Sequence, residues 1–282
     1  MQKIEIQLTS NHSARPFMAD ATFLADGTAK PVVIFNHGFK GFKDWGPFAL
    51  IAEEFGQNGF VFIKMNFSHN GVTAANPFDF ADLEAFANNN FSIELDDTGV
   101  LIDTLFEGAS GLPSEEMDLS RLYIIGHSRG GASAILKANE DARIKGLVTW
   151  AAVSNLEAWH SKQEVDAWKQ VGRIYIHNSR TNQEMPMDYQ LVENYVANKD
   201  RLEVPKAVQN MSIPMLSFHG TEDPTVPLQA VQDISHWNPE AQIEIIEGAG
   251  HTFGGTHPFD DQVLPPHLKL VTDKSIEFCK TL

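Results

Sequence analysis

Gly126-His127-Ser128-Arg129-Gly130 decides the fold of this sequence. Residues 121–125 before it, Arg-Leu-Tyr-Ile-Ile, are typical of a strand, and residues 132–137 after it, Ala-Ser-Ala-Ile-Leu-Lys, favour a helix. The Gly-x-Ser-x-Gly pattern between them therefore predicts a tight strand-to-helix turn. Such a turn holds the Ser128 hydroxyl clear of the backbone at the end of a sheet, where it can attack a carbonyl carbon.

The two glycines of this pattern support a catalytic interpretation. A Cβ at Gly126 or Gly130 would collide with the crowded turn. The helix that follows directs its first N–H groups and its positive dipole end toward the site, where an oxyanion would form. The alternative is a Gly-Ser-Gly loop that serves only as a turn.

Apolar segments alternate with helical segments along the rest of the chain. Continuous apolar runs, typical of parallel strands covered on both faces, occupy residues 31–35, 60–65, 144–152 and 213–218. Helical spacing is found at residues 47–55, 92–106, 228–236 and 264–282. Shorter strand candidates are residues 3–8 and 21–24, which could form an antiparallel edge, and residues 242–246. Residues 66–90 are rich in Asn and Gly and are expected to form a long surface loop. The pattern predicts an α/β protein with a mostly parallel, doubly wound sheet and helices on both faces.

With a strand before and a helix after Ser128, the chain resembles the α/β-hydrolase family over nearly its whole length. The resemblance implies a single α/β-hydrolase domain over residues 1–282. Residues 153–212 separate two of the strands, although a crossover needs little more than about a dozen residues. We therefore expect an insertion at residues 153–205, which resembles the lid of many family members. Within it, residues 173–177 and 183–187 could form a short hairpin.

A serine needs a base and a group that orients the base, and the family supplies them in the chain order Ser, acid, His. His251 follows the last predicted strand, where the family has its catalytic histidine, and His257 is the fallback. Residues 217–227 resemble the family's His-Gly-x-x-Asp-x-x-Val-Pro loop, in which Asp223 takes the place of the aspartate. Glu222 is the adjacent rival. The expected triad is Ser128, Asp223 and His251.

The same resemblance implies an oxyanion hole formed by the backbone N–H groups of Phe39 and Arg129. The side chains of these two residues should matter little for that role. Lys40 and Lys43 lie close to Phe39 in the sequence, and they could contact a substrate carboxylate or simply be solvated.

The insertion carries aromatic and methionine side chains that could cover an apolar acyl or aromatic group. The candidates for substrate contact are Trp159, Met185, Met187 and Tyr189. Packing of the insertion onto the core is the alternative. The insertion is similar to the lids of cinnamoyl and feruloyl esterases, and the core is similar to dienelactone hydrolases. Those hydrolases usually carry cysteine where this chain has Ser128, which argues against their activity.

We therefore expect a serine hydrolase that cleaves carboxylic esters of small to medium apolar or aromatic acyl groups through an acyl-enzyme on Ser128. A peptidase or acyltransferase on the same triad remains open, and a peptidase would need acidic residues of the insertion to hold the substrate amine. A catalytically silent binding module is the third interpretation. It would be expected to lack a triad member, and none is missing.

Composition restricts the partners of the chain. The net charge is −16, with eleven acidic residues and no Lys or Arg between residues 65 and 120, so nucleic acid and anionic membranes are poor partners. A small-molecule ester is the expected partner, and the oligomeric state stays open.

No phosphate-binding loop or dinucleotide spacing is present, and His251 and His257 lack the spacing and third ligand of a metal site, so we expect no cofactor and no metal. The single cysteine, Cys279, and the absence of a signal-peptide pattern or long apolar run favour a cytoplasmic location.

Overall fold

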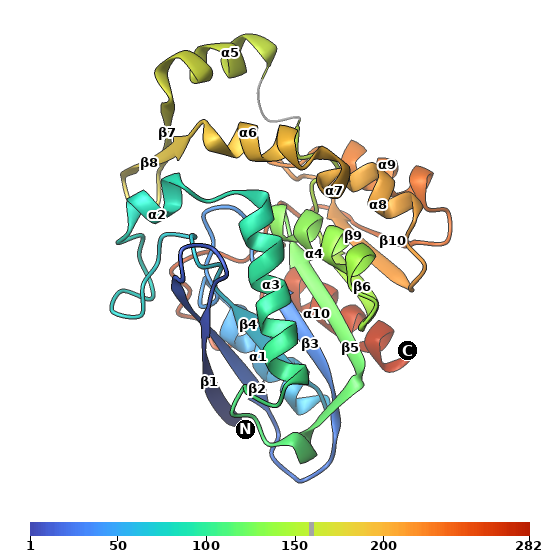
Figure 1. The fold of residues 1–282 in the computed structure, drawn as a ribbon. Coiled ribbons are helices and arrows are strands. Elements are labelled where there is room, and N and C mark those ends of the chain that lie inside the picture. Colours follow the sequence, from blue (N-terminus) through green and yellow to red (C-terminus); the bar gives the residue numbers. More distant parts are fainter. Residues whose placement is uncertain (158–160) are drawn as a thin grey trace.

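The computed structural model describes residues 1–157 and 161–282. Within these residues, eight strands form one sheet in the order β1-β2-β4-β3-β5-β6-β9-β10 (Figure 1). The strands are β1 (Gln2–Thr9), β2 (Pro16–Phe23), β3 (Lys30–Asn36), β4 (Val61–Met65), β5 (Met117–His127), β6 (Ile144–Trp150), β9 (Met215–Gly220) and β10 (Gln242–Ile246). Neighbouring strands from β4 to β10 are parallel, whereas β2 is antiparallel to β1 and to β4. The mostly parallel sheet with an antiparallel edge is confirmed.

Helices cover both faces of this sheet, which explains why β3 and β4 are buried along their whole length. One face is covered by α1 (Phe48–Gln57) and α10 (Pro266–Lys280). The other face is covered by α3 (Phe91–Phe106), α4 (Arg129–Glu140), α8 (Val204–Gln209) and α9 (Gln229–Trp237). Successive side chains along a strand point to opposite faces of the sheet. In β3, Ile34 packs toward α3 and Phe35 packs toward α1. Figure 1 shows α3 and α4 in front of the sheet and α1 and α10 behind it.

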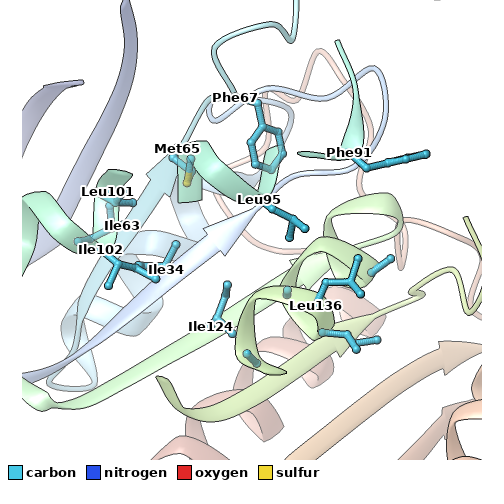
Figure 2. Packing of buried hydrophobic residues seen from close by; sticks show 14 of the residues in the cluster. Ile34, Ile63, Met65, Phe67, Phe91, Leu95, Leu101, Ile102, Ile124 and Leu136 are labelled. Carbon is cyan, nitrogen blue, oxygen red and sulfur yellow. The ribbon is translucent and has the colours of Figure 1, made fainter. Parts of the chain in front are cut away.

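The α3 helix anchors the front layer. Figure 2 shows its Leu101 and Ile102 beside Ile34 and Ile63 of the central strands, and Leu95 belongs to the same buried hydrophobic cluster. Burial of aliphatic side chains of this kind contributes about 1.5–3 kcal/mol each to the free energy of unfolding.

The start of α3 differs from the sequence prediction, which placed it at Ser92. The N-cap is Asn90, whose side-chain oxygen accepts a hydrogen bond from the Ile93 N–H at 3.0 Å. Ser92 instead donates its hydroxyl to the side chain of Asn194 at 3.0 Å. Asn and Ser are both good N-cap residues. Here Asn90 caps the helix, because the hydroxyl of Ser92 is hydrogen-bonded to Asn194.

The segment at residues 66–90 is only in part the surface loop expected. It contains a short helix, α2 (Leu83–Ala87), and its first part is buried. Asn66 Oδ1 accepts hydrogen bonds from the Lys43 N–H at 2.8 Å and from Asn70 Nδ2 at 3.2 Å. Because these side chains satisfy one another, a polar segment can lie inside the protein.

The insertion lies between β6 and β9, beyond the upper end of the main sheet in Figure 1. It contains α5 (Lys162–Val171), β7 (Arg173–Asn178), β8 (Gln183–Asp188), α6 (Gln190–Ala197) and α7 (Lys199–Leu202). Strands β7 and β8 pair antiparallel as a separate hairpin, which confirms that part of the prediction. Arg173 ties the hairpin to α2 through an ion pair with Glu84 at 2.7 Å.

Membrane insertion of a helix requires a long apolar stretch. No helix in the described part of the chain has both the length and the apolar character that a bilayer crossing needs.

Candidate active site

The turn at Ser128 joins β5 to α4 and places the serine at the carboxyl end of the sheet. Ser128 has φ 57° and ψ −121°, a sparsely populated backbone conformation. A Cβ on Gly126 would lie 2.1 Å from the carbonyl oxygen of Gly130, and a Cβ on Gly130 would lie 2.3 Å from that of Asn36. Only glycine fits at both positions, so the predicted reason for the two glycines is confirmed.

The loop after β3 lies against this turn. A Cβ on Gly38 would lie 3.0 Å from the Cβ of Ser128, so the backbone that leads into Phe39 approaches the serine closely. Arg129 is the first residue of α4, at the positive end of the helix dipole. Phe39, Ser128 and Arg129 line one pocket of about 520 Å³. Phe39 and Arg129, the two residues expected to supply the oxyanion hole, therefore border the same pocket as Ser128.

An acid and a histidine meet beyond the ends of β9 and β10. His251 Nδ1 donates a hydrogen bond to Asp223 Oδ2 at 2.8 Å, and the Asp223 side chain is only 1% exposed. The other carboxylate oxygen, Oδ1, accepts from the N–H groups of Thr225 at 2.8 Å and Val226 at 2.9 Å. Burial alone would raise the pKa of Asp223, but these hydrogen bonds and the nearby His251 lower it. The rival acid, Glu222, is exposed.

The structure places the serine and the histidine on the same cavity. Ser128 and His251 both line a second pocket, of about 230 Å³, together with Phe39 and His127. His251 also has a partly exposed ring, with 15% of its side chain accessible. The three predicted triad residues follow β5, β9 and β10 at the carboxyl end of the parallel sheet, where open α/β sheets bind ligands.

Two further histidines fix the loops of this arrangement. His127 Nε2 donates to the His251 carbonyl oxygen at 2.9 Å and so fixes the loop that carries His251. His37 Nδ1 donates to the Gly38 carbonyl oxygen at 2.9 Å, and its Nε2 accepts from Asn70 Nδ2 at 3.2 Å. Both rings are positioning groups held in one tautomer.

The remaining candidates for the base are occupied elsewhere. His257 Nδ1 accepts a hydrogen bond from the Gly46 N–H at 2.8 Å. His219 Nε2 donates to the Val226 carbonyl oxygen at 2.9 Å and lies 3.5 Å from Asp223 Oδ2, beneath the acid loop. Of these histidines, His251 is the one that pairs with Asp223 and lines the pocket of Ser128.

The neutral rings of His37 and His127 predict a loss of stability in acid. Burial lowers the pKa of His37 to about 4 and that of His127 to about 3. In the unfolded chain a histidine titrates near about pH 6.5, so between these values the unfolded state binds more protons. The free energy of unfolding should therefore fall as pH falls, by about 1.4 kcal/mol per pH unit for each ring below about pH 6.

Urea unfolding at pH 7 and pH 5 measures this effect. The decrease should be smaller in His127→Gln, which keeps an N–H donor for the His251 carbonyl but cannot gain a proton. An equal decrease in both proteins would contradict the role given to His127.

The side chain of Arg129 has a role that the sequence did not suggest. Its guanidinium forms an ion pair with the buried carboxylate of Glu94 on α3 and lies 4.6 Å from the centre of the Phe39 ring. The side chain thus links α3, α4 and the loop after β3. Only the backbone N–H of Arg129 was assigned a role from the sequence, because the partner of its side chain on α3 is 35 residues away in the sequence.

The predicted substrate contacts of the insertion are not brought to Ser128. Met185 and Met187 are 0% and 3% exposed, within the hydrophobic cluster that also contains Trp168. Tyr189 precedes α6 and packs against the same cluster. None of these three lines either pocket beside Ser128. Trp159 lies outside the described residues.

The pockets beside Ser128 are lined in part by residues that the sequence analysis missed. The larger one includes Val153, Ser154 and Asn155 from the segment after β6, and Ala230 and Asp233 from α9. The smaller one includes Asn178 and Arg180 from the hairpin of the insertion. The residues after β6 could have been predicted, because ligands bind beyond the carboxyl ends of parallel strands. No local sequence pattern indicated that the hairpin residues would line a pocket.

Metal-binding groups are not assembled in this structure. Across residues 1–157 and 161–282, no three His, Cys, Asp or Glu side chains are grouped as a metal ion would require.

Comparisons with known proteins agree with this architecture. A model of the prolyl oligopeptidase family matches residues 92–262. No curated protein matches the sequence. Est1E from Butyrivibrio proteoclasticus with bound ferulic acid aligns at 18% identity over 97% of this chain and 98% of that one, with a TM-score of 0.71. The esterase domain of a Rhodothermus marinus protein aligns at 16% identity over 100% and 99%, with a TM-score of 0.66. A puromycin-hydrolyzing peptidase from Mycobacterium tuberculosis aligns at 16% identity over 98% of this chain and 38% of that one, with a TM-score of 0.63.

Proposed function

The chain belongs to the prolyl oligopeptidase family of α/β-hydrolases, and from that premise we propose that it is a serine esterase that acts through an acyl-enzyme on Ser128. The observation that carries the proposal is the hydrogen bond between His251 and Asp223 beside a pocket that His251 shares with Ser128. A nucleophile, a base and a group that orients the base are the parts this chemistry needs.

In the proposed reaction, Ser128 Oγ attacks the acyl carbon while its proton passes to His251 Nε2. The tetrahedral intermediate collapses, the carbon–oxygen bond to the alcohol breaks, and His251 returns the proton to the leaving oxygen. Water then attacks the acyl-enzyme with His251 again taking the proton, and the acid leaves as Ser128 regains it. Asp223 keeps Nδ1 protonated, so that Nε2 can accept the proton at each stage.

The backbone N–H groups of Phe39 and Arg129 would hold the oxyanion of each tetrahedral intermediate. Loss of one such donor costs about 3 kcal/mol of barrier in related chemistry. The Arg129 side chain would assist indirectly, because its packing on the Phe39 ring fixes the loop that carries one donor.

The larger pocket fits the acyl group in this proposal. Its volume of about 520 Å³ lies within the usual range of roughly 300–1,000 Å³ for small-molecule sites. Its lining includes the apolar side chains of Val153, Val226, Pro227 and Ala230. A small to medium apolar or aromatic acyl group suits this surface. The structural similarity to Est1E, which was solved with ferulic acid bound, supports an aromatic one.

A peptidase on the same triad is the second candidate, because the matching family is that of prolyl oligopeptidases. The larger pocket contains one carboxylate that could hold a substrate amine, that of Asp233, which accepts a hydrogen bond from Gln229 Nε2 at 2.9 Å. Two acidic residues of the insertion are engaged elsewhere: Asp188 pairs with Arg173, and Glu164 caps α5.

Turnover of two substrate series separates these functions. We expect 4-nitrophenyl esters, graded in acyl length and including a cinnamate, to give a higher kcat/KM than aminoacyl and prolyl 4-nitroanilides. Faster cleavage of the anilides would establish the peptidase instead. Labelling of folded protein by a fluorophosphonate checks the nucleophile in either case, and no adduct on Ser128 would favour a silent binding module.

A further inference from the structure

The smaller pocket beside Ser128 is closed on one side by the hairpin of the insertion. Asn178 ends β7, and Arg180 lies in the turn between β7 and β8. Both residues line the same pocket as Ser128 and His251, and Lys40 from the loop after β3 lines it too. Two cationic side chains and an amide therefore share a cavity with the proposed nucleophile and base.

Arg180 differs from the other arginines in its surroundings. Each of the others forms an ion pair with at least one carboxylate, namely Arg15, Arg121, Arg129, Arg143, Arg173 and Arg201. Within the described residues, Arg180 has no such ion pair, and both its Nη1 and Nη2 are buried without a hydrogen-bond partner in the protein. The guanidinium lies 5.4 Å from the centre of the Phe42 ring and 5.5 Å from that of Phe80. The rings hold it in place and leave its donors unused.

Other polar groups of the hairpin are also buried without a hydrogen-bond partner. Asn178 is only 5% exposed, and its Nδ2 has no hydrogen-bond partner in the protein. The hairpin also holds the buried Thr181 Oγ1 and Gln183 Oε1 without partners, so half of the ten such atoms in the described residues lie here. Buried polar atoms normally find partners, and the unused donors of Arg180 and Asn178 beside an active-site pocket indicate a ligand that accepts hydrogen bonds.

The positive charge of the pocket indicates that this ligand is negatively charged. Burial and the charge of Arg180 both lower the pKa of Lys40 and that of His257, as expected where positive groups gather. Lys40 forms no ion pair with a carboxylate in the part of the chain that the structure describes. Burial lowers the pKa of Arg180, and the negative charge of Asp79 raises it. Within the described residues these two side chains form no ion pair. In a protein of net charge −16, this cavity is locally positive.

We propose that the hairpin pocket is a carboxylate subsite, so that the preferred esters carry a carboxylate held by Arg180, Asn178 and Lys40. This specificity rests on the proposed esterase function. The guanidinium offers two parallel N–H donors, which match the two oxygens of a carboxylate. The volume of about 230 Å³ admits a small charged group better than a long acyl chain. Since His251 lines this pocket and protonates the leaving oxygen, the carboxylate belongs on the alcohol part of the ester.

Matched esters test the subsite. The first pair is 3-carboxyphenyl acetate and 3-carbamoylphenyl acetate, which carry a carboxylate or a neutral amide on the leaving group. The second pair, 4-nitrophenyl succinate and 4-nitrophenyl succinamate, carries the same groups on the acyl part. We expect wild-type kcat/KM to favour the carboxylate in the first pair by about 10- to 100-fold, the size of a charge-assisted hydrogen bond. A preference confined to the second pair would overturn the placement on the alcohol, and no preference in either pair would overturn the subsite.

Variants assign the preference to Arg180. Arg180→Gln should lose it while still hydrolysing the carbamoyl ester, and Arg180→Lys should keep part of it. The matched control, Arg121→Gln, removes an arginine from the exposed start of β5 and should keep the full preference. A preference that survives in Arg180→Gln contradicts the proposal. If Arg180→Gln does not fold, Asn178→Ala and Lys40→Gln should each reduce the preference several-fold, and unchanged preference in both overturns it.

A binding measurement separates failure of the subsite from failure of the esterase function. If wild-type protein hydrolyses neither the carbamoyl ester nor the succinamate, the proposed function is wrong. Benzoate should nevertheless raise the Tm of the wild type more than benzamide does, and this difference should vanish in Arg180→Gln. Equal shifts by benzoate and benzamide in the wild type would reject the carboxylate subsite on its own.

Discussion

Ser128→Ala is expected to lower kcat for ester hydrolysis by about 10⁵-fold or more, because it removes the proposed nucleophile and the other two residues of the proposed triad cannot act alone. The turn should survive, since its geometry depends on Gly126 and Gly130 and the Ser128 side chain supplies no cap to α4. The measurement is single-turnover hydrolysis of an aryl ester, together with urea unfolding of both proteins. An unchanged free energy of unfolding would assign the loss to chemistry.

The control for this variant is Ser120→Ala, in the exposed first part of β5, which removes a hydroxyl far along the same strand. It should keep wild-type turnover and wild-type labelling by a fluorophosphonate. Turnover in Ser128→Ala within tenfold of the wild type would show that another group is the nucleophile.

Sequence alone predicted the part of the site that depends on local rules. The strand, turn and helix around Ser128 follow from propensity and from two glycines that sterics require, and the structure confirms that turn. The pairing of His251 with Asp223 could be anticipated only because the resemblance fixes which loops carry them. Neither residue has a local pattern that would bring it to the other across 28 positions.

The parts that sequence missed depend on contacts between distant segments. Arg180 lies in a Ser-Arg-Thr-Asn turn that is typical of a solvated hairpin, and only the packing of that hairpin beside Phe42 and Phe80 turns it into a buried cation. Met185 and Met187 illustrate the converse case. Their apolar character suggested substrate contact, yet the insertion needs them for its own packing.

Polarity also misled the prediction for the segment after β4. Asn66 and Asn70 have the composition of a loop, but each is nine-tenths buried or more and hydrogen-bonded beneath the active-site loop. Through Asn70 the segment holds the tautomer of His37, next to Gly38 and Phe39. A polar residue can therefore belong to the support of a site when its partners are distant in sequence.

Asp223→Asn is expected to lower kcat by about 10⁴-fold with little change in KM. The amide oxygen of the substituted side chain can still accept the N–H groups of Thr225 and Val226, so the loop should keep its shape. Its NH₂ group would then face His251 Nδ1 and donate to it. The ring would hold its proton on Nε2, which could no longer accept the proton of Ser128.

Glu222→Gln is the matched control, because it removes the carboxylate next to Asp223 from an exposed side chain and leaves the backbone hydrogen bond of Glu222 to Ala249 in place. It should retain kcat within about threefold, since surface charges contribute little to a buried site. A large loss in Glu222→Gln together with a small one in Asp223→Asn would reverse the assignment of the acid. Equal small losses would mean that His251 needs no carboxylate, which the 2.8 Å hydrogen bond to a buried aspartate argues against.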